Sequence, residues 1–520
     1  MKIFKSMLFY IAMLCISSIG FAEEIVGIDQ KIDQFFGTYL GWFSNAIFYG
    51  VKIVDGVTFP LIVAWLFVAA IVFTFYFGFV QFRNFRLSLD IVSGKYTDPN
   101  AKEAGEVSHF QALTSALSGT VGLGNIAGVG VALAIGGPGA TFWMIVCGLF
   151  GMASKFTECT LGVKYRNENA DGTVSGGPMY YLSKAFKEKG HVKISKFLAV
   201  GFAIMTIFST FGAGNMFQGN QANAMIVQTF GIAPGYGWVT GIILALLVAS
   251  VIIGGMPSIG SVTSKLVPFM AILYIGMSLI VLIYHYDQIG SAIEQIFVGA
   301  FTGAGVAGGF IGALIQGLKR ATFSNEAGVG TSAIAHAAVK TKEPITEGLV
   351  SLLEPFIDTV VICTMTALVI TISGMNTGAL SGVNLTSAAF TETSFIFEYL
   401  LAITVVMFAF STMISYSYYG LKAWTYLFGE TKTNEIVYKT IFCLFVIVGT
   451  SISFSAAIDF SDAAMFSMSI FNIIGLYYLM PIVKKELISF IARVDSGEIK
   501  KYRVEVRSPI KVAIARFLKA

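Results

Sequence analysis

Residues Ser118 to Gly130 read Ser-Gly-Thr-Val-Gly-Leu-Gly-Asn-Ile-Ala-Gly-Val-Gly, inside an apolar run over 109–136 that is long enough to cross a membrane. So many glycines weaken a helix, and we expect the run to unwind near its middle. In hydrocarbon every backbone N–H and C=O needs a partner, so an unwound stretch survives only where it lines a cavity or binds something. The stretch therefore predicts a binding site within a broken membrane helix.

A second apolar run, over 303–338, carries a related motif. Asn125-Ile-Ala-Gly-Val-Gly130 returns as Asn325-Glu-Ala-Gly-Val-Gly330. The two breaks are five expected spans apart, an odd number, so the copies face opposite ways in the membrane. This pattern predicts two inverted five-helix repeats, each opened by an interrupted helix, with one additional span before them. A chance match in a glycine-rich chain is the alternative.

The composition places the chain in a membrane. Of 520 residues, 55% are hydrophobic and only 12% are charged. Soluble enzymes and nucleic-acid-binding modules are excluded, because neither keeps so much apolar surface out of water. We expect an all-α integral membrane protein that contacts lipid and no nucleic acid. The five cysteines show no metal-binding or redox spacing and are expected to be reduced.

Eleven runs meet the requirement of about twenty apolar residues per membrane span. Their approximate limits are 57–82, 109–136, 140–163, 196–226, 237–255, 263–285, 303–338, 349–373, 393–427, 435–457 and 462–483. Lys and Arg cluster after the first and third runs, whereas the connections 227–236, 286–302 and 374–392 contain none. The positive-inside rule then places the N-terminus outside and the C-terminus in the cytoplasm. We expect the location to be the inner membrane of a bacterium or an archaeon.

The expected organisation follows from these runs. Residues 1–22 are expected to form a cleaved signal peptide, with an uncleaved anchor as the alternative. A periplasmic segment and the extra first span occupy 23–106. The two repeats occupy 107–285 and 286–483, and a basic cytoplasmic tail occupies 484–520.

A broken helix offers two kinds of ligand group. Freed carbonyls coordinate a cation, and the half-helix after the break turns N–H groups and a positive dipole toward an anion. A zwitterionic amino acid with a sodium ion fits both. Gly122 and Gly124 would let a carboxylate approach the backbone, and Asn125 stands among them. A packing face of small residues is the alternative.

Polar residues inside other spans extend this candidate site. Gln218 and Gln221 share a helix face, which favours a polar cavity over simple bonding between helices. Ser411 and Thr412 offer hydroxyl oxygens of the kind that sodium accepts, although such hydroxyls often bond within their own helix.

Asp358 is a carboxylate deep in an apolar run, and such residues are functional candidates. An ion pair with Lys319 or Arg320 is its alternative role. Glu326, in the second break, is expected to be neutralised by Arg320. The histidines near span ends are assigned no proton relay.

Several sequence blocks resemble the alanine or glycine:cation symporter family. They are GTVGLGNIAGV (119–129), GGPGATFWM (136–144), GLFGMASKF (148–156), GGPMYYL (176–182), FSNEAG (323–328), FIDT (356–359) and FSTMISYSYYG (410–420). The resemblance implies a LeuT-like fold of five plus five helices and sodium-driven uptake of alanine or glycine.

The same resemblance implies roles for individual residues. The Thr120 to Asn125 segment would hold substrate and sodium. The carbonyls of Ser118 and Val121, with the hydroxyls of Ser411 and Thr412, would form the sodium site. Asn125 and Asp358 are the next candidate sodium ligands. Gln218 and Gln221 match amides of the substrate pocket, and Tyr416 stands where the family has Trp, which leaves the transported amino acid open.

Three rival functions remain at this point. A carrier driven by protons, or specific for another amino acid, is the first. An ion channel is less favoured, because two non-identical breaks fit a central alternating site better than a continuous pore. An enzyme is not expected, since the chain has neither an HExxH nor a GxxxxGK[ST] motif.

Overall fold

The structure is a computed structural model that describes residues 41–54, 57–98, 103–169, 172–232, 235–302, 309–374 and 380–502. The expected signal peptide, 1–22, lies outside the described residues. Two small antiparallel sheets accompany a helical body: β1 (Gly50–Val54) pairs with β2 (Val57–Pro60), and β3 (Asn167–Glu168) pairs with β4 (Val174–Ser175).

The described α-helices follow one another with short connections. They are α3 (Leu61–Tyr76), α4 (Val80–Arg83), α5 (Phe85–Val92), α6 (His109–Thr120), α7 (Val129–Gly136), α8 (Gly139–Lys164), α9 (Pro178–Glu188), α10 (Val192–Phe211), α11 (Phe217–Phe230), α12 (Gly237–Ile252), α13 (Gly255–Tyr284), α14 (Ile289–Thr302), α15 (Gly309–Asn325), α16 (Ser332–His336), α17 (Pro344–Ser351), α18 (Leu353–Pro355), α19 (Thr364–Ile372), α20 (Gly382–Thr391), α21 (Ile396–Phe428), α22 (Lys432–Gly449) and α23 (Phe454–Asp495). Wide π-helical turns form η1 (Gly124–Gly128), η2 (Gly212–Met216) and η4 (Phe356–Cys363), and η3 (Tyr286–Gln288) is a 3-10 turn.

The protein is a multi-pass membrane protein. Within the described residues, six continuous helical segments are long and apolar enough to cross a membrane, and a seventh is reached if one bent pair counts as one span. Helices also lie in the other expected runs, but α3 and α12 have only 16 residues each. The number of eleven crossings therefore stays a prediction.

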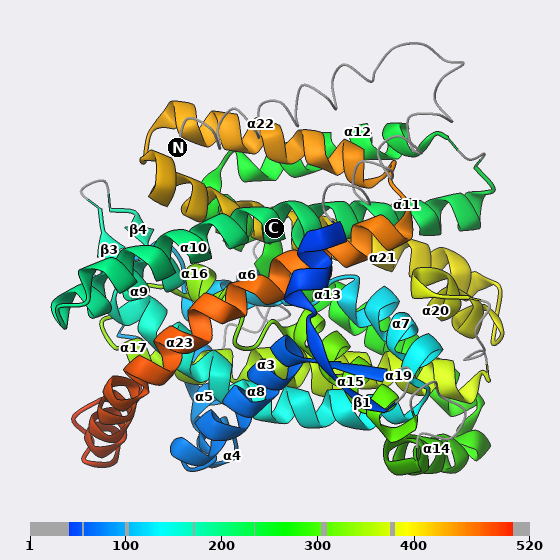
Figure 1. Ribbon diagram of the computed structural model, residues 1–520, viewed down its shortest axis with the longest axis horizontal. Helices are drawn as coiled ribbons and strands as arrows, with labels where there is room; N and C mark the ends of the chain where they lie inside the picture. The colour runs from blue at the N-terminus through cyan, green and yellow to red at the C-terminus, as the bar shows by residue number, and fades with distance from the viewer. Residues whose placement is uncertain are drawn as a thin grey trace, which may run out of the picture.

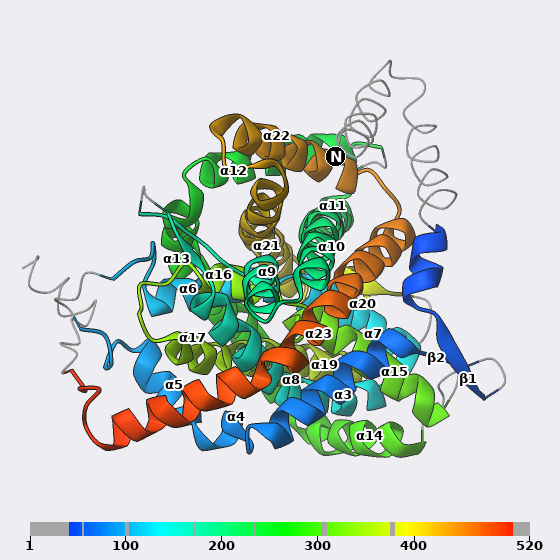
Figure 2. The same cartoon turned by 60° about the vertical axis from the view of Figure 1, so that its left-hand side comes forward.

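Long helices form the body of the molecule. In both views α10 and α11 lie near α21, and α12 packs beside α22 along one edge (Figures 1 and 2). On the opposite side α8 packs against α15 and α17. The helix α23 crosses the body diagonally, and its C-terminal end projects beyond it (Figure 2).

The glycine-rich stretch of the first expected break does interrupt its helix. The α6 helix starts with a capping box between Ser108 and Gln111 and ends at Thr120. The chain then bends by 49° before it continues from Gly124 to Gly136. Both segments are buried, so the break lies inside the protein.

The second break differs in conformation from the first, although five of the six residues in the two motifs are identical. The α15 helix ends at Asn325, and the next residues have φ angles of 57° at Glu326, 82° at Gly328 and 101° at Gly330. In the first copy Gly128 has a helical φ of −62°. The first break thus precedes the shared motif, whereas the second falls within it.

Two charged contacts brace the projecting end of α23. The Arg493 guanidinium donates to both carboxylate oxygens of Glu343, at 2.7 and 2.6 Å. Glu343 precedes α17, and Lys164 at the end of α8 reaches Glu486 at 2.6 Å. This end of α23 is therefore fastened to two neighbouring helices.

Candidate functional site

Side-chain oxygens satisfy the backbone at the first break. The Gly122 amide donates to Asn125 Oδ1 at 2.9 Å, and the Leu123 amide donates to Gln218 Oε1 at 3.0 Å. In a regular helix these amides would donate to the carbonyls of Ser118 and Gly119. Unwinding therefore frees two carbonyls from the helical pattern.

Thr412 on α21 lies directly against this backbone. A Cβ built on Gly122 would lie 2.3 Å from Thr412 Oγ1, so only glycine leaves room there for the hydroxyl. Thr412 is buried, and its hydroxyl has no hydrogen-bond partner among the described residues. A buried hydroxyl without a partner is unfavourable unless something binds to it.

Three neighbouring hydroxyls of this region are engaged, whereas the buried Tyr419 hydroxyl, which lies beside Gly119, has no hydrogen-bond partner among the described residues. Ser118 Oγ donates to the Ser411 carbonyl at 2.6 Å, which ties α6 to α21, and Ser411 Oγ donates to the Phe408 carbonyl of its own helix. Thr120 Oγ1 also turns back to its own helix. The structure thus brings together Ser118, Val121, Ser411 and Thr412 where α6 ends, but only Thr412 presents a free side-chain oxygen.

The two glutamines of α11 have different surroundings. Gln218 bonds the broken backbone through Oε1 and donates to the Ala213 carbonyl at 2.9 Å. Gln221 accepts from the Val383 amide at the start of α20, at 3.0 Å, and donates to Asn220. Gln218 therefore lies at the break, whereas Gln221 holds α20 over it.

Asp358 in η4 connects the two breaks. Asn125 Nδ2 donates to Asp358 Oδ1 at 2.6 Å, while Ser324 and Thr359 donate to Oδ2 at 2.6 and 2.7 Å. The carboxylate is fully buried and, among the described residues, pairs with no Lys or Arg. This polar cluster joins both interrupted helices through one acidic group.

Lys319 and Arg320 form ion pairs with neither Asp358 nor Glu326. Both contact Asp462 on α23, Lys319 at 2.8 Å. The expected neutralisation of Glu326 by Arg320 is therefore wrong. Glu326 instead accepts hydrogen bonds from Thr331 and Tyr416. Arg320 and Asp462 are 142 residues apart in the sequence, so helix packing rather than local spacing brings them together.

Tyr416 is buried, with 2% of its surface exposed. This excludes a lipid-facing or interfacial position for its ring. The ring packs against Gly214 in η2, where an added Cβ would lie 2.0 Å from it. Its hydroxyl points to Glu326 in the second break rather than to the glutamines of α11.

The sequence interpretation missed several polar residues around the breaks. Ser324 and Thr359 hold Asp358, Thr366 donates to the Asn125 carbonyl at 2.8 Å, and Thr386 donates to the Ile126 carbonyl at 3.0 Å. Ser324 and Thr359 lie within the FSNEAG and FIDT blocks, which was the available signal. The two later threonines carry no such signal.

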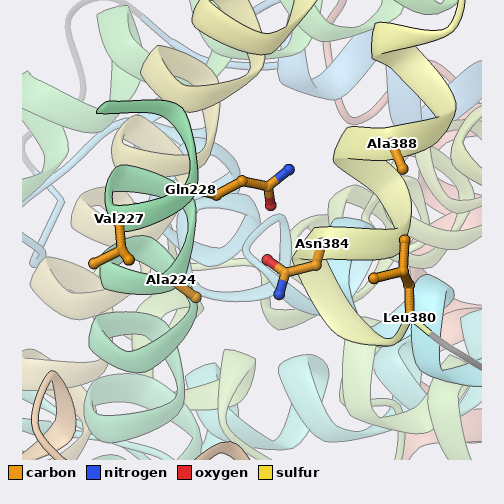
Figure 3. Close-up of a pocket in the computed structure, with 6 residues that line it drawn as sticks. All are labelled: Ala224, Val227, Gln228, Leu380, Asn384 and Ala388. Atoms are coloured by element: carbon orange, nitrogen blue, oxygen red, sulfur yellow. The ribbon is translucent and has the colours of Figure 1, made fainter. Parts of the chain in front are cut away.

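A separate cavity lies between α11 and the α20 segment (Figure 3). It has a volume of about 360 Å³ and is lined by Ala224, Val227, Gln228, Leu380, Asn384 and Ala388. Its walls are joined where Gln228 donates to Ser387 at 3.2 Å. Asn384 follows Val383, the partner of Gln221, so the cavity borders the cover over the first break.

The chain is similar to several known proteins. The chain is 40% identical over 436 residues to the sodium/alanine symporter AgcS of Methanococcus maripaludis, covering 83% of this chain and 94% of that protein. It is 33% identical to the amino-acid carrier protein AlsT of Bacillus subtilis, covering 79% and 85%. The structure of MhsT in complex with L-phenylalanine is similar with a TM-score of 0.49, 15% identity and coverage of 75% and 99%.

Both sequence relatives are named for transport and not for catalysis. The model of the sodium:alanine symporter family matches residues 44–504, which is most of the chain. The chain belongs to the sodium:alanine symporter family.

Proposed function

We propose that this protein is a secondary active transporter that couples sodium entry to uptake of a small neutral amino acid, alanine or glycine. It works by alternating access in a LeuT-like arrangement of two inverted five-helix repeats. The N-terminus lies outside, and the basic end of α23 lies in the cytoplasm of the cell membrane.

The unpartnered Thr412 hydroxyl carries this proposal. It is buried against a broken backbone whose Ser118 and Gly119 carbonyls have left the helical pattern. Hydroxyl and carbonyl oxygens are the ligands that a hard cation accepts. Ser118, Val121, Ser411 and Thr412 are the proposed sodium ligands, and Thr412 is the one whose side chain is uncommitted.

The proposed amino-acid contacts lie at the same break, and Gln218 Oε1 is close to the same face of Gly122 as Thr412. Asn125 Oδ1 and Gln218 Oε1 accept from the Gly122 and Leu123 amides, as the carboxylate of a substrate would. Substrate binding would displace these side-chain oxygens. Thr120, Gly124, Gln221 and Tyr416 complete the proposed contacts, with Gln221 acting through α20.

Uptake by sealed vesicles tests the function directly. One sodium ion moving through about 100 mV and a tenfold gradient supplies roughly 3.7 kcal/mol, enough for about 500-fold accumulation of solute. Vesicles with the purified full chain should accumulate labelled alanine or glycine under a sodium gradient. Accumulation unaffected by removal of that gradient would overturn the proposal.

Proton coupling is the second candidate, and Asp358 favours it. A buried carboxylate held by neutral donors can bind a proton as well as a sodium ion. Uptake that persists without sodium while a proton gradient is maintained, and that is lost in Asp358→Asn, would select this alternative.

A further inference from the structure

One carboxylate joins the ends of both interrupted spans. Glu347 on α17 contacts His109 at the start of α6 through Oε1 and His336 at the end of α16 through Oε2. His336 is fully buried and His109 is 6% exposed. The half-helices on one side of the two breaks are thus held together by imidazole–carboxylate contacts, at the end that we propose faces the cytoplasm.

The geometry around His336 requires an additional proton. Its Nδ1 contacts Glu347, and its Nε2 lies 2.6 Å from Glu354 Oε1. A neutral imidazole carries one N–H, and an ionised carboxylate carries none. Two such contacts need two protons, so the group binds one proton more than a neutral imidazole between two carboxylates. That proton is shared between the imidazole and the carboxylates.

The surrounding charges favour this additional proton. Lys155 on α8 lies 3.4 Å from Glu354 and 3.8 Å from Glu158, and bonds Ser332. The charged or titratable groups around His336 are His109 on α6, Lys155, Glu158 and Cys159 on α8, Arg166 after α8, Glu347 on α17, Glu354 on α18 and Tyr419 on α21. With Glu326 of the second break, which also lies near Lys155 and Glu354, four carboxylates stand against Lys155 and Arg166, and the extra proton reduces this imbalance.

A metal ion fits the site around His336 less well than a proton does. Cys159, His336 and Glu354 converge, with ligand atoms within 4.8 Å of one another. The Lys155 ammonium, however, lies beside the same Glu354. A divalent cation would be repelled by that ammonium, whereas a proton lets the imidazole donate to both carboxylates.

We propose that Glu347, His336 and Glu354 form a proton-binding site whose occupancy holds the cytoplasmic halves of the two broken spans together. This inference rests on the alternating access of the proposed function, because α6 and α16 separate only when the site opens inward. Inward opening that moves α16 away from α17 and α18 separates His336 from Glu347 and Glu354. His336 then becomes an ordinary imidazole, which releases its extra proton above about pH 6.5. Acid pH on the cytoplasmic side therefore stabilises the closed exit, and alkaline pH favours opening.

Transport measurements at controlled internal pH test this site. Vesicles containing the full chain are loaded with labelled alanine and sodium, and exchange with external alanine is followed while only internal pH is changed. Between internal pH 6.5 and 8 the wild-type rate should rise about three- to tenfold, since one linked proton changes an equilibrium by at most tenfold per pH unit.

Two variants and a matched control isolate the group. In Glu347→Gln the amide donates to His336 and accepts from His109, so every contact survives without the extra proton. Its exchange rate should vary less than twofold over the same pH range. His336→Gln should give the same flat profile. His191→Gln, at the exposed histidine between α9 and α10, should keep the wild-type profile.

Thermal unfolding of the purified proteins supplies a readout that needs no transport. The folded wild type binds a proton that the unfolded imidazole releases near pH 6.5, so its unfolding temperature should fall as pH rises above that value. Glu347→Gln should lose this part of the slope, and His191→Gln should not. Parallel slopes for wild type and Glu347→Gln would overturn the proton site. Wild-type vesicles that exchange neither alanine nor glycine in a sodium-dependent way would instead remove the proposed function.

Discussion

Tyr416 on α21 donates its hydroxyl hydrogen to Glu326, a buried residue whose φ of 57° places it in the left-handed region. A non-glycine residue adopts this conformation only where its surroundings fix it. The Thr331 hydroxyl is the second donor to the same carboxylate. A helix remote in sequence thus helps to hold the second break in shape.

Removal of this hydroxyl should destabilise the protein. Tyr416→Phe keeps the ring against Gly214 but deprives a buried carboxylate of one of its two donors. The expected loss is about 1–3 kcal/mol in the free energy of unfolding. Thermal unfolding of the purified protein in detergent measures it, and an unchanged midpoint would contradict the contact.

Selectivity should also respond at this position. Tyr416→Ala opens space beside the breaks, so serine, cysteine or valine should compete better with labelled alanine. Tyr416→Trp supplies an indole donor and should restore the preference usual in the family. Identical inhibition profiles for wild type and both variants would remove Tyr416 from the proposed pocket.

The two hydroxyls of the proposed sodium site should contribute unequally. Thr412→Ala removes the unpartnered oxygen and should raise the sodium concentration for half-maximal uptake by roughly tenfold or more. Ser411 Oγ is committed to the Phe408 carbonyl, so Ser411→Ala should have a smaller effect. Sodium titration of alanine uptake compares them. A larger effect of Ser411→Ala would reverse the assignment.

Gly122 should accept no side chain while Thr412 is present. A Cβ in Gly122→Ala would overlap the Thr412 hydroxyl and displace α21 from the break. We expect loss of sodium-dependent uptake and a destabilisation of about 1–3 kcal/mol. The double variant with Thr412→Ala should recover part of the stability but not the sodium dependence. Equal stability of the single and double variants would contradict this contact.

Asp462 should be indispensable while its basic partners remain. Asp462→Asn leaves the buried Arg320 guanidinium without a carboxylate, at an expected loss of about 3–5 kcal/mol. Replacing both residues, as in Arg320→Met with Asp462→Leu, should recover most of that stability. Yield and unfolding temperature of the two variants are the measurements. A double variant less stable than Asp462→Asn would show that the pair is needed for more than charge balance.

The position of the first break could be predicted from the sequence, because glycine content within an apolar run is a local property of the chain. The run at Ser118 to Gly130 has too many glycines for a stable helix, and the structure bends there by 49°. The motif that begins at Asn325 shares five of six residues with the one at Asn125, but this match did not predict its conformation. Side-chain partners from other helices decide whether Ala-Gly-Val-Gly is helical or unwound.

Partners distant in sequence could not be predicted. His109 and Glu347 are 238 residues apart, and Tyr416 and Glu326 are 90 apart. No periodicity links such residues, because their proximity depends on how α6, α17 and α21 pack. The π-helical turns η2 and η4 were likewise expected as regular helix, since one extra residue per turn leaves an apolar run unchanged.

The helix α23 is a strut braced near both ends. Asp462 fastens it to Arg320 on α15, and Arg493 fastens it to Glu343 about 46 Å further along the axis, at about 1.5 Å per residue. A continuous helix is stiff, so a sideways displacement at the Asp462–Arg320 contact would also strain the Arg493–Glu343 contact. Pro481 lies between them and removes one backbone donor. Bending of α23 should therefore concentrate at Pro481. The stiffness of the helix at this residue should limit how independently α15 and the Glu343 segment can move.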